Sequence, residues 1–266
     1  MSQRLMFLMT VCVLLVGCHA LHLKPVVEPP SKVEMEREQL IIHSDFRLPR
    51  KHRLFEDLEK RRDDLGRDLL LPASDEPVHI YLFADQDEFR KYAKRIAGEF
   101  QDRRAFFVKS DTELNVYGYW GDRIAEDLRH EVTHAYLHGV VDNIPLWLDE
   151  GLAEFYEVER SKNGLNTNHI FLLTNEFRKG KWQPNLERLE MFREPSDFNQ
   201  LEYAESWLWV HFLMHESAET RKIVRDSLAR LRISGEAQSI SRTIETQFPD
   251  VQIQVVEHLK RLADGY

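Results

Sequence analysis

The chain has 266 residues, of which 42% are hydrophobic, enough for the core of one compact domain or of two closely packed lobes. Its formal net charge of −9 argues against nucleic acid and anionic lipid headgroups as binding partners. The two cysteines, Cys12 and Cys18, both lie near the N-terminus, so we expect the folded part to be stabilised by its core without a disulfide.

The N-terminus has the pattern of a bacterial lipoprotein signal. Arg4 precedes an apolar run at residues 5–16, which is short for a membrane span but fits the core of a signal peptide. The run ends in LVGC at residues 15–18, which resembles the bacterial lipobox and implies cleavage before an acylated Cys18. We therefore expect a signal peptide at residues 1–17 and a lipid anchor that holds the protein on a membrane without spanning it. An ordinary secretory signal or a short anchor with a chance cysteine is the alternative.

A tether is expected between the anchor and the folded part. Residues 18–38 contain Pro25, Pro29 and Pro30 among charged side chains, a composition typical of a spacer. His19, directly after the cysteine, resembles the default for sorting to the outer membrane. This resemblance implies an envelope protein that faces the periplasm.

Residues 39–120 alternate between strand and helix patterns, which is typical of an α/β lobe. We expect a hairpin turn at residues 110–112, and the strand after it should lead directly into the next helix. The patterns predict strands at residues 40–42, 78–83, 105–109 and 113–119, and helices at residues 50–70 and 85–97.

A histidine pair with the spacing of metal ligands lies on the helix predicted at residues 122–138. His130 and His134 are four residues apart, so both imidazoles project from one face about one turn apart. Glu131 lies beside them and can take a proton from metal-bound water. Two helical histidines can also be packing or surface residues, so the pair needs a further ligand nearby. The apolar stripe of this helix is separate from the histidines and consists of Ile124, Leu128, Val132 and Ala135.

That further ligand is expected on a second helix, which begins near Asn143 and Pro145 and folds back on the first. Glu150 and Glu154 lie one turn apart on the same face of this helix. Either can be the third ligand, and the other would then accept a hydrogen bond from an imidazole. Two acids on a solvated face are the alternative. Three protein ligands with one open position are the pattern of catalytic Zn²⁺.

Both segments resemble the gluzincin metallopeptidases, and more closely the small peptidase-MA-like proteins of bacterial envelopes. The resemblance rests on HEVTH at residues 130–134 and PLWLDEGLAEFYE at residues 145–157. It implies a zincin-like fold, bound zinc and a peptide or protein substrate. It also makes Glu150 the ligand and Glu154 the acid that supports a zinc histidine. The 15-residue gap between His134 and Glu150 is short for the large families, and spacing counted as in thermolysin favours Glu154.

The remaining expectations concern the substrate. YAESW at residues 203–207 resembles a segment that follows the zinc motifs in those envelope proteins, which implies that Tyr203 donates a hydrogen bond to the oxyanion. A tyrosine packed on the core is the alternative. The resemblance also implies that the strand at residues 114–119 is an edge strand to which an extended peptide adds, although an ordinary half-buried strand fits its pattern as well. His211 and His215 are expected to be packing or surface residues.

The fold expected is therefore α+β. A mixed α/β lobe at residues 39–120 should pack its sheet on the histidine helix, and a mainly helical, zinc-binding lobe should occupy residues 121–266. The function expected is hydrolysis of peptide bonds outside the cytoplasm, by an endopeptidase because no segment resembles the acidic motif that captures a free amine. A scaffold lipoprotein without turnover and a peptidoglycan amidase are the alternatives, and the oligomeric state is open.

Overall fold

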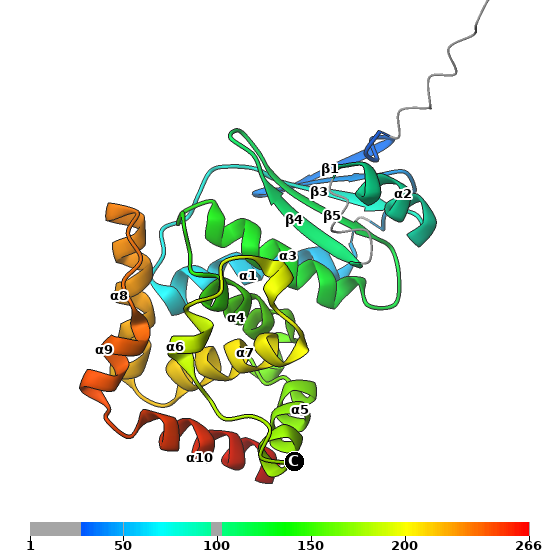
Figure 1. Ribbon diagram of the computed structural model, residues 1–266. Helices are drawn as coiled ribbons and strands as arrows, with labels where there is room; N and C mark the ends of the chain where they lie inside the picture. The colour runs from blue at the N-terminus through cyan, green and yellow to red at the C-terminus, as the bar shows by residue number, and fades with distance from the viewer. Residues whose placement is uncertain (1–27, 50, 97–102, 266) are drawn as a thin grey trace, which may run out of the picture.

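The computed structural model describes residues 28–49, 51–96 and 103–265, which form an α+β fold with one mixed sheet (Figure 1). The strands of the sheet are β1 (Val33–Arg37), β2 (Leu40–Ser44), β3 (Val78–Phe83), β4 (Ala105–Lys109) and β5 (Leu114–Tyr119). The α-helices in this part of the chain are α1 (Arg53–Leu69), α2 (Gln86–Ile96), α3 (Ile124–His138), α4 (Leu146–Glu157), α5 (Thr167–Arg178), α6 (Leu186–Leu189), α7 (Gln200–His215), α8 (Ala218–Ser234), α9 (Ile240–Gln247) and α10 (Val251–Asp264).

The molecule is layered around α3. The sheet packs on one side of α3, and α4 packs on another, so the histidine helix lies between the sheet and the helical region (Figure 1). Alternate residues of β2, β3 and β5, such as Ile42, Ile80 and Val116, are fully buried toward α1 and α3. On the opposite face of the sheet, α2 packs Phe89 against Phe106. The predicted packing of a sheet on the histidine helix is therefore confirmed.

The order of the strands is β1-β2-β3-β5-β4, with parallel pairing in the centre and antiparallel pairing at both ends. The prediction that residues 114–119 form an edge strand is wrong, because β5 lies between β3 and β4. The tight turn between Ser110 and Glu113 reverses the chain, so β5 runs antiparallel to β4, with Phe107 opposite Val116. The edge strand on this side of the described sheet is therefore β4.

The sheet also begins earlier than the predicted start of the folded part at residue 39. β1 pairs antiparallel with β2, with Val33 opposite Ser44. Its short alternation of Val33 and Met35 with glutamates places Met35 against the main core. The predicted signal peptide, Cys18 and the start of the tether lie outside the described residues. Among the residues that are described, no helix is both long enough and apolar enough to cross a bilayer.

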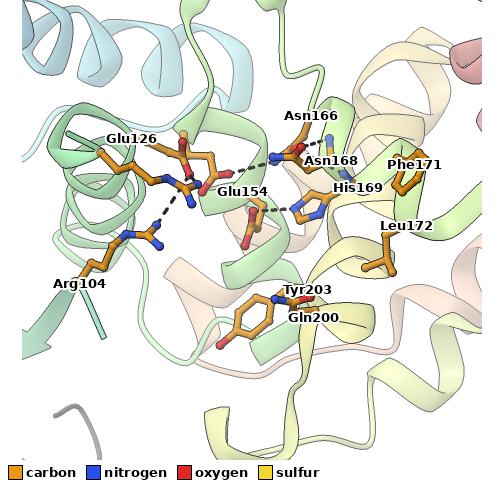
Figure 2. Close-up of a pocket in the computed structure, with 12 residues that line it drawn as sticks. Arg104, Glu126, Glu154, Asn166, Asn168, His169, Phe171, Leu172, Gln200 and Tyr203 are labelled. Atoms are coloured by element: carbon orange, nitrogen blue, oxygen red, sulfur yellow. Dashed lines mark hydrogen bonds and ion pairs between the residues drawn. The ribbon is translucent and has the colours of Figure 1, made fainter. Parts of the chain in front are cut away.

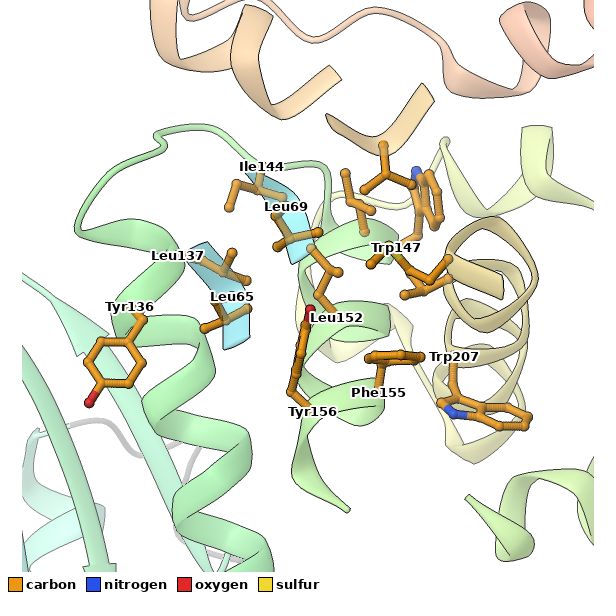
Figure 3. Close-up of a cluster of buried hydrophobic side chains, with 14 of the residues drawn as sticks. Leu65, Leu69, Tyr136, Leu137, Ile144, Trp147, Leu152, Phe155, Tyr156 and Trp207 are labelled. Carbon is orange, nitrogen blue, oxygen red and sulfur yellow. The ribbon is translucent and has the colours of Figure 1, made fainter. Parts of the chain in front are cut away.

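The centre of the helical region is α4, which packs between α3 and α7 (Figure 3). Trp147, Leu152 and Trp207 are fully buried here, and each side chain of this kind stabilises the fold by about 1.5–3 kcal/mol. α4 and α7 pack closely at Gly151, where a β-carbon would lie 2.6 Å from the carbonyl oxygen of Ser206. Only glycine therefore fits this crossing without moving a backbone.

Gly151→Ala is expected to lower the free energy of unfolding by about 1–3 kcal/mol or more, because the added methyl forces α4 and α7 apart. Urea denaturation followed by circular dichroism measures the loss. Gly66→Ala in α1 is the matched control, since its β-carbon would lie 3.4 Å from its nearest neighbour, Leu71 O. Alanine there is expected to be neutral or to stabilise the helix by up to about 1 kcal/mol. Equal stabilities for Gly151→Ala and the wild type would contradict the packing argument.

His211 and His215 are packing residues, as predicted. His211 is buried against Phe155 and Trp207, and its Nδ1 lies 2.9 Å from His258 Nε2. Burial, reinforced by the neighbouring histidines, lowers the pKa of His211 to about 2. The imidazole is therefore neutral in the folded protein throughout the usual pH range.

This depressed pKa predicts a loss of stability in acid. The unfolded chain takes up the proton near pH 6.5, well before the folded protein does, so His211 contributes fully above that pH. Below it, the contribution falls by up to about 1.4 kcal/mol per pH unit. Urea denaturation between pH 7 and pH 4.5 is expected to give a flatter dependence for His211→Gln than for the wild type. Parallel curves would show that His211 does not cause the acid sensitivity.

Candidate metal centre

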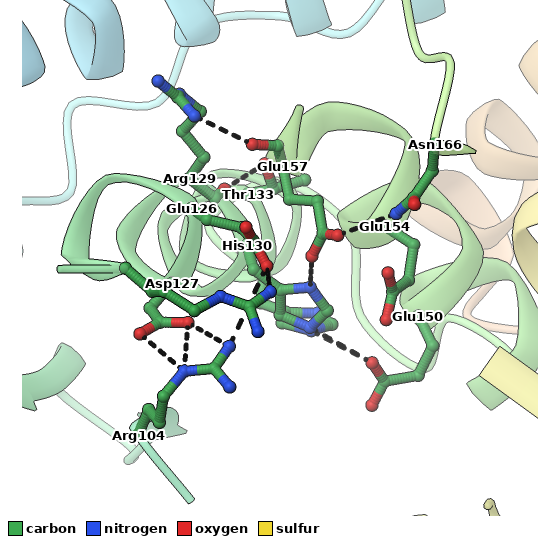
Figure 4. Close-up of polar contacts among 12 residues, drawn as sticks. Arg104, Glu126, Asp127, Arg129, His130, Thr133, Glu150, Glu154, Glu157 and Asn166 are labelled. Carbon is green, nitrogen blue, oxygen red and sulfur yellow. Dashed lines mark hydrogen bonds and ion pairs between the residues drawn. The ribbon is translucent and has the colours of Figure 1, made fainter. Parts of the chain in front are cut away.

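Three donor atoms from α3 and α4 meet at one point. His130 Nε2 lies 3.2 Å from His134 Nε2, and Glu150 Oε2 lies 3.4 Å and 3.5 Å from these two atoms. The apolar side of α3 is buried under the sheet, and both histidines contact Glu150 of α4, as Figure 4 shows for His130. The three residues predicted as metal ligands are therefore brought together.

The size of this donor triangle, formed by His130, His134 and Glu150, fits a zinc ion. Tetrahedral zinc with bonds of about 2.0–2.1 Å separates its ligand atoms by roughly 3.3 Å, close to all three observed distances. Glu150 is only 5% exposed, and its Oε2 has no hydrogen-bond partner among the described residues. Its nearest donors are the two imidazoles of the triangle, and a cation held between the three groups would contact this oxygen directly.

The outer nitrogens of both histidines face carboxylates. Glu157 Oε2 lies 3.1 Å from His130 Nδ1, and Asp149 Oδ1 lies 3.0 Å from His134 Nδ1. The other oxygen of Asp149 pairs with His138 Nε2 at 2.9 Å. A carboxylate on Nδ1 fixes the tautomer and leaves Nε2 available for a metal. Each histidine of the donor triangle is thus oriented by its own acid.

Glu154 pairs with a histidine outside the donor triangle, contrary to the prediction. Its Oε2 lies 2.7 Å from His169 Nε2 of α5, as Figure 2 shows. Glu157, one turn further along α4, takes the place beside His130, and its second oxygen accepts a hydrogen bond from Asn166. His169 reaches Glu154 from α5, and the sequence pattern of α4 alone could not predict this contact.

The ionisable groups of the donor triangle shift one another strongly. Burial lowers the pKa of His130, but pairing with Glu150 and Glu157 raises it well above its ordinary value. For His134, Asp149 likewise outweighs burial and raises the pKa to about 10. Burial raises the pKa of Glu150, whereas both histidines lower it, to about 2. Without a metal the triangle holds protons on its imidazoles, so metal binding must displace them.

The surrounding acids are shifted in opposite directions. Burial raises the pKa of Asp149, but His134 and His138 lower it far below its ordinary value. Burial, together with the charge of Glu154, raises the pKa of Glu157 to about 8. The pKa of Glu154 is lowered despite its burial, because it pairs with His169. Of the two neighbouring carboxyl groups, Glu154 and Glu157, it is Glu154 that is ionised at neutral pH.

A cavity of about 430 Å³ opens beside the donor triangle and is lined by Arg103, His130, Glu131 and Tyr203. A second cavity, of about 570 Å³, adjoins it and shares Tyr203 as a lining residue (Figure 2). Tyr203 lies in the first turn of α7, whose start is fixed by a capping box between Asn199 and Glu202. Glu131 and Tyr203, both predicted as catalytic, thus face the same space.

Several site residues were missed by the sequence patterns. Asp149 and Glu157 are within α4 and share the motif region, but nothing local distinguishes them from other acids on a helix. Arg103 belongs to no predicted motif, and it lines the cavity from the segment just before β4. Its Nη2 lies 3.4 Å from Tyr203 Oη, although the two residues are 100 positions apart.

Comparison with known proteins adds a family without an assigned activity. A family model described as a protein of unknown function (DUF1570) matches residues 124–230. The matched span begins at α3 and includes the donor triangle and Tyr203. No curated protein matches the chain. The part of the chain that carries the candidate metal centre is therefore similar to this family of unknown function.

Proposed function

We propose that the protein is a zinc-dependent peptidase of the gluzincin type, anchored to a membrane by a lipid on Cys18 and acting outside the cytoplasm. The donor triangle carries the proposal, because its sides of 3.2, 3.4 and 3.5 Å suit one zinc ion. Structural zinc sites are closed by four protein ligands, whereas three ligands beside a cavity leave a position for water or substrate. The resemblance of residues 121–157 to gluzincins points to the same chemistry.

Zinc held by the donor triangle would supply a Lewis acid and lower the pKa of a water molecule to about 7. Glu131 follows His130 on α3, is 7% exposed and lines the cavity. Burial raises the pKa of Glu131, while His130 and His134 act in the opposite direction. A carboxylate with a raised pKa is suited to accept a proton from water and to pass it to the leaving amine.

Tyr203 has the properties of a hydrogen-bond donor to the reacting carbonyl. Burial and the charge of Glu150 raise the pKa of Tyr203 to about 12, so the phenol keeps its proton at neutral pH. Donors placed where charge develops stabilise the transition state of amide hydrolysis. Tyr203 also remains partly buried against Phe198, whose ring lies edge-on at 5.3 Å between centroids.

The edge strand β4 supports an extended peptide as the substrate. Its outer side has no strand neighbour in the described sheet, and Arg103, two residues before Ala105, reaches the cavity. A peptide chain can add to such an edge through backbone hydrogen bonds. Phe107 of β4 stacks near His138, so the strand runs beside the histidine helix and a peptide on it would pass the cavity.

Two measurements on the full-length protein purified in detergent test the proposal. Elemental analysis is expected to find one zinc ion per chain, and a quenched fluorescent peptide library is expected to be cleaved, with activity lost on chelation and restored by zinc. Protein without zinc, or hydrolysis that a chelator leaves unchanged, would contradict the proposal. Mass spectrometry of the N-terminus tests the anchor separately, because an unmodified Cys18 would exclude it.

A further inference from the structure

We infer that Arg103 is a catalytic residue of the proposed hydrolysis and that, together with Tyr203, it binds the carbonyl oxygen of the scissile bond as negative charge develops there. The inference rests on the proposed function. It goes beyond the resemblance to gluzincins, which points only to Tyr203.

Arg103 and Tyr203 reach the cavity from different parts of the fold. Arg103 lies two residues before the edge strand β4, whereas Tyr203 lies in the first turn of α7. Their side chains meet with Arg103 Nη2 at 3.4 Å from Tyr203 Oη, and both line the cavity that contains His130 and Glu131. The charges of Glu131 and Glu150 also act on the Arg103 guanidinium. The arginine therefore shares a cavity with the proposed base and with His130 of the donor triangle.

The hydrogen bonding of this pair leaves a donor for the substrate. A phenol has one O–H donor and two acceptor lone pairs, whereas a guanidinium has five N–H donors and no acceptor. Arg103 must therefore donate to Tyr203 Oη, and the proton of Tyr203 is left to donate to another oxygen. The guanidinium acts on the same oxygen through its positive charge.

The charge of Arg103 favours the transition state over the substrate. An amide carbonyl is neutral when the peptide binds, and its oxygen becomes negative only as the tetrahedral species forms. A cation in a partly buried site interacts with that charge more strongly than it would in water. Arg103 should thus raise kcat and have little effect on KM.

The neighbouring Arg104 is engaged differently. Its guanidinium contacts Asp127 of α3 through Nε at 2.9 Å and 3.0 Å and through Nη2 at 2.6 Å (Figure 4). This contact ties the start of β4 to the histidine helix. Arg104 also lines the cavity, so the matched control is Arg90→Gln, which removes the same charge from an exposed position on α2.

Steady-state kinetics on the zinc-loaded protein test the inference, with a peptide found by the library screen. Arg103→Gln is expected to lower kcat by about 10²–10³-fold, as loss of one oxyanion donor does, with KM within about threefold of the wild type and zinc content unchanged. Arg103→Lys, which keeps the charge but loses the planar fork, is expected to regain about tenfold of that loss. The control Arg90→Gln is expected to lower kcat by less than about threefold.

A double-mutant cycle tests whether Arg103 and Tyr203 act on the same oxygen of the substrate. The double variant Arg103→Gln, Tyr203→Phe is expected to lose far less activity than the product of the two single losses, because either loss already disrupts the same interaction. Multiplicative losses would contradict a shared oxygen and overturn the inference. An unchanged kcat in Arg103→Gln would also overturn it, as would a rise in KM alone, which marks ground-state binding.

These outcomes are separate from failure of the proposed function. Wild-type protein without zinc or hydrolysis would contradict the peptidase itself. Active, zinc-loaded wild type with an equally active Arg103→Gln variant would contradict only the role of Arg103. Circular dichroism and urea denaturation of Arg103→Gln and Arg103→Lys check that both variants fold.

Discussion

Glu131→Gln is expected to lower the rate of peptide hydrolysis by about 10²–10⁴-fold while the protein keeps its zinc. Glutamine has nearly the same shape as glutamate but cannot accept a proton from water. Glu131 lines the cavity and is not part of the donor triangle, so the metal ligands are unchanged. The measurement combines kcat on a fluorescent peptide with elemental analysis of the same preparation.

Glu113→Gln is the matched control for this prediction. Glu113 lies in the turn between β4 and β5, where its carboxylate accepts a hydrogen bond from Asn115. The control should hydrolyse the peptide at the wild-type rate. If Glu131→Gln kept full activity, the proposed base would be wrong, and if it lost zinc, Glu131 would be a ligand instead.

Glu150→Gln is expected to weaken zinc binding by at least about 100-fold. The substitution replaces a charged oxygen of the donor triangle by a neutral amide, and zinc sites of this type use carboxylate or imidazole ligands. Glu154→Gln should retain zinc, because Glu154 pairs with His169. Glu157→Gln should weaken zinc binding by only about 10–100-fold, since Glu157 acts on the metal through His130.

Competition with a chromophoric chelator measures these affinities, and elemental analysis gives the stoichiometry. The three variants form an internal series, because each removes one carboxylate from the same face of α4. If Glu154→Gln lost zinc and Glu150→Gln retained it, the third ligand would be reassigned to Glu154, as the spacing of the motifs had suggested. Retention of zinc by all three variants would remove α4 from the metal site.

The sequence predicted the parts of the site that local geometry determines. His130 and His134 share a helix, so their spacing of four residues is enough to place both imidazoles together. Glu150 belongs to the next helix in the chain, and the short connection fixes its approach. The strands at residues 78–83 and 105–109 were also predicted with the bounds that the structure gives.

The parts that were missed depend on contacts between distant segments. The choice between Glu154 and Glu157 as the partner of His130 is decided by His169 on α5. Whether β4 or β5 occupies the sheet edge depends on which strand pairs with β3, and the hairpin pattern is the same in both cases. The position of Arg103, two residues before β4, depends on the same strand order.

The close crossing of α4 and α7 at Gly151 also constrains how the site can move. Gly151 follows Glu150 directly, and its contact on α7 is Ser206, three residues after Tyr203. Because the two backbones are in contact there, we expect Glu150 and Tyr203 to move together. If the cavity opens as a peptide enters, we expect the sheet with β4 to move relative to these two residues.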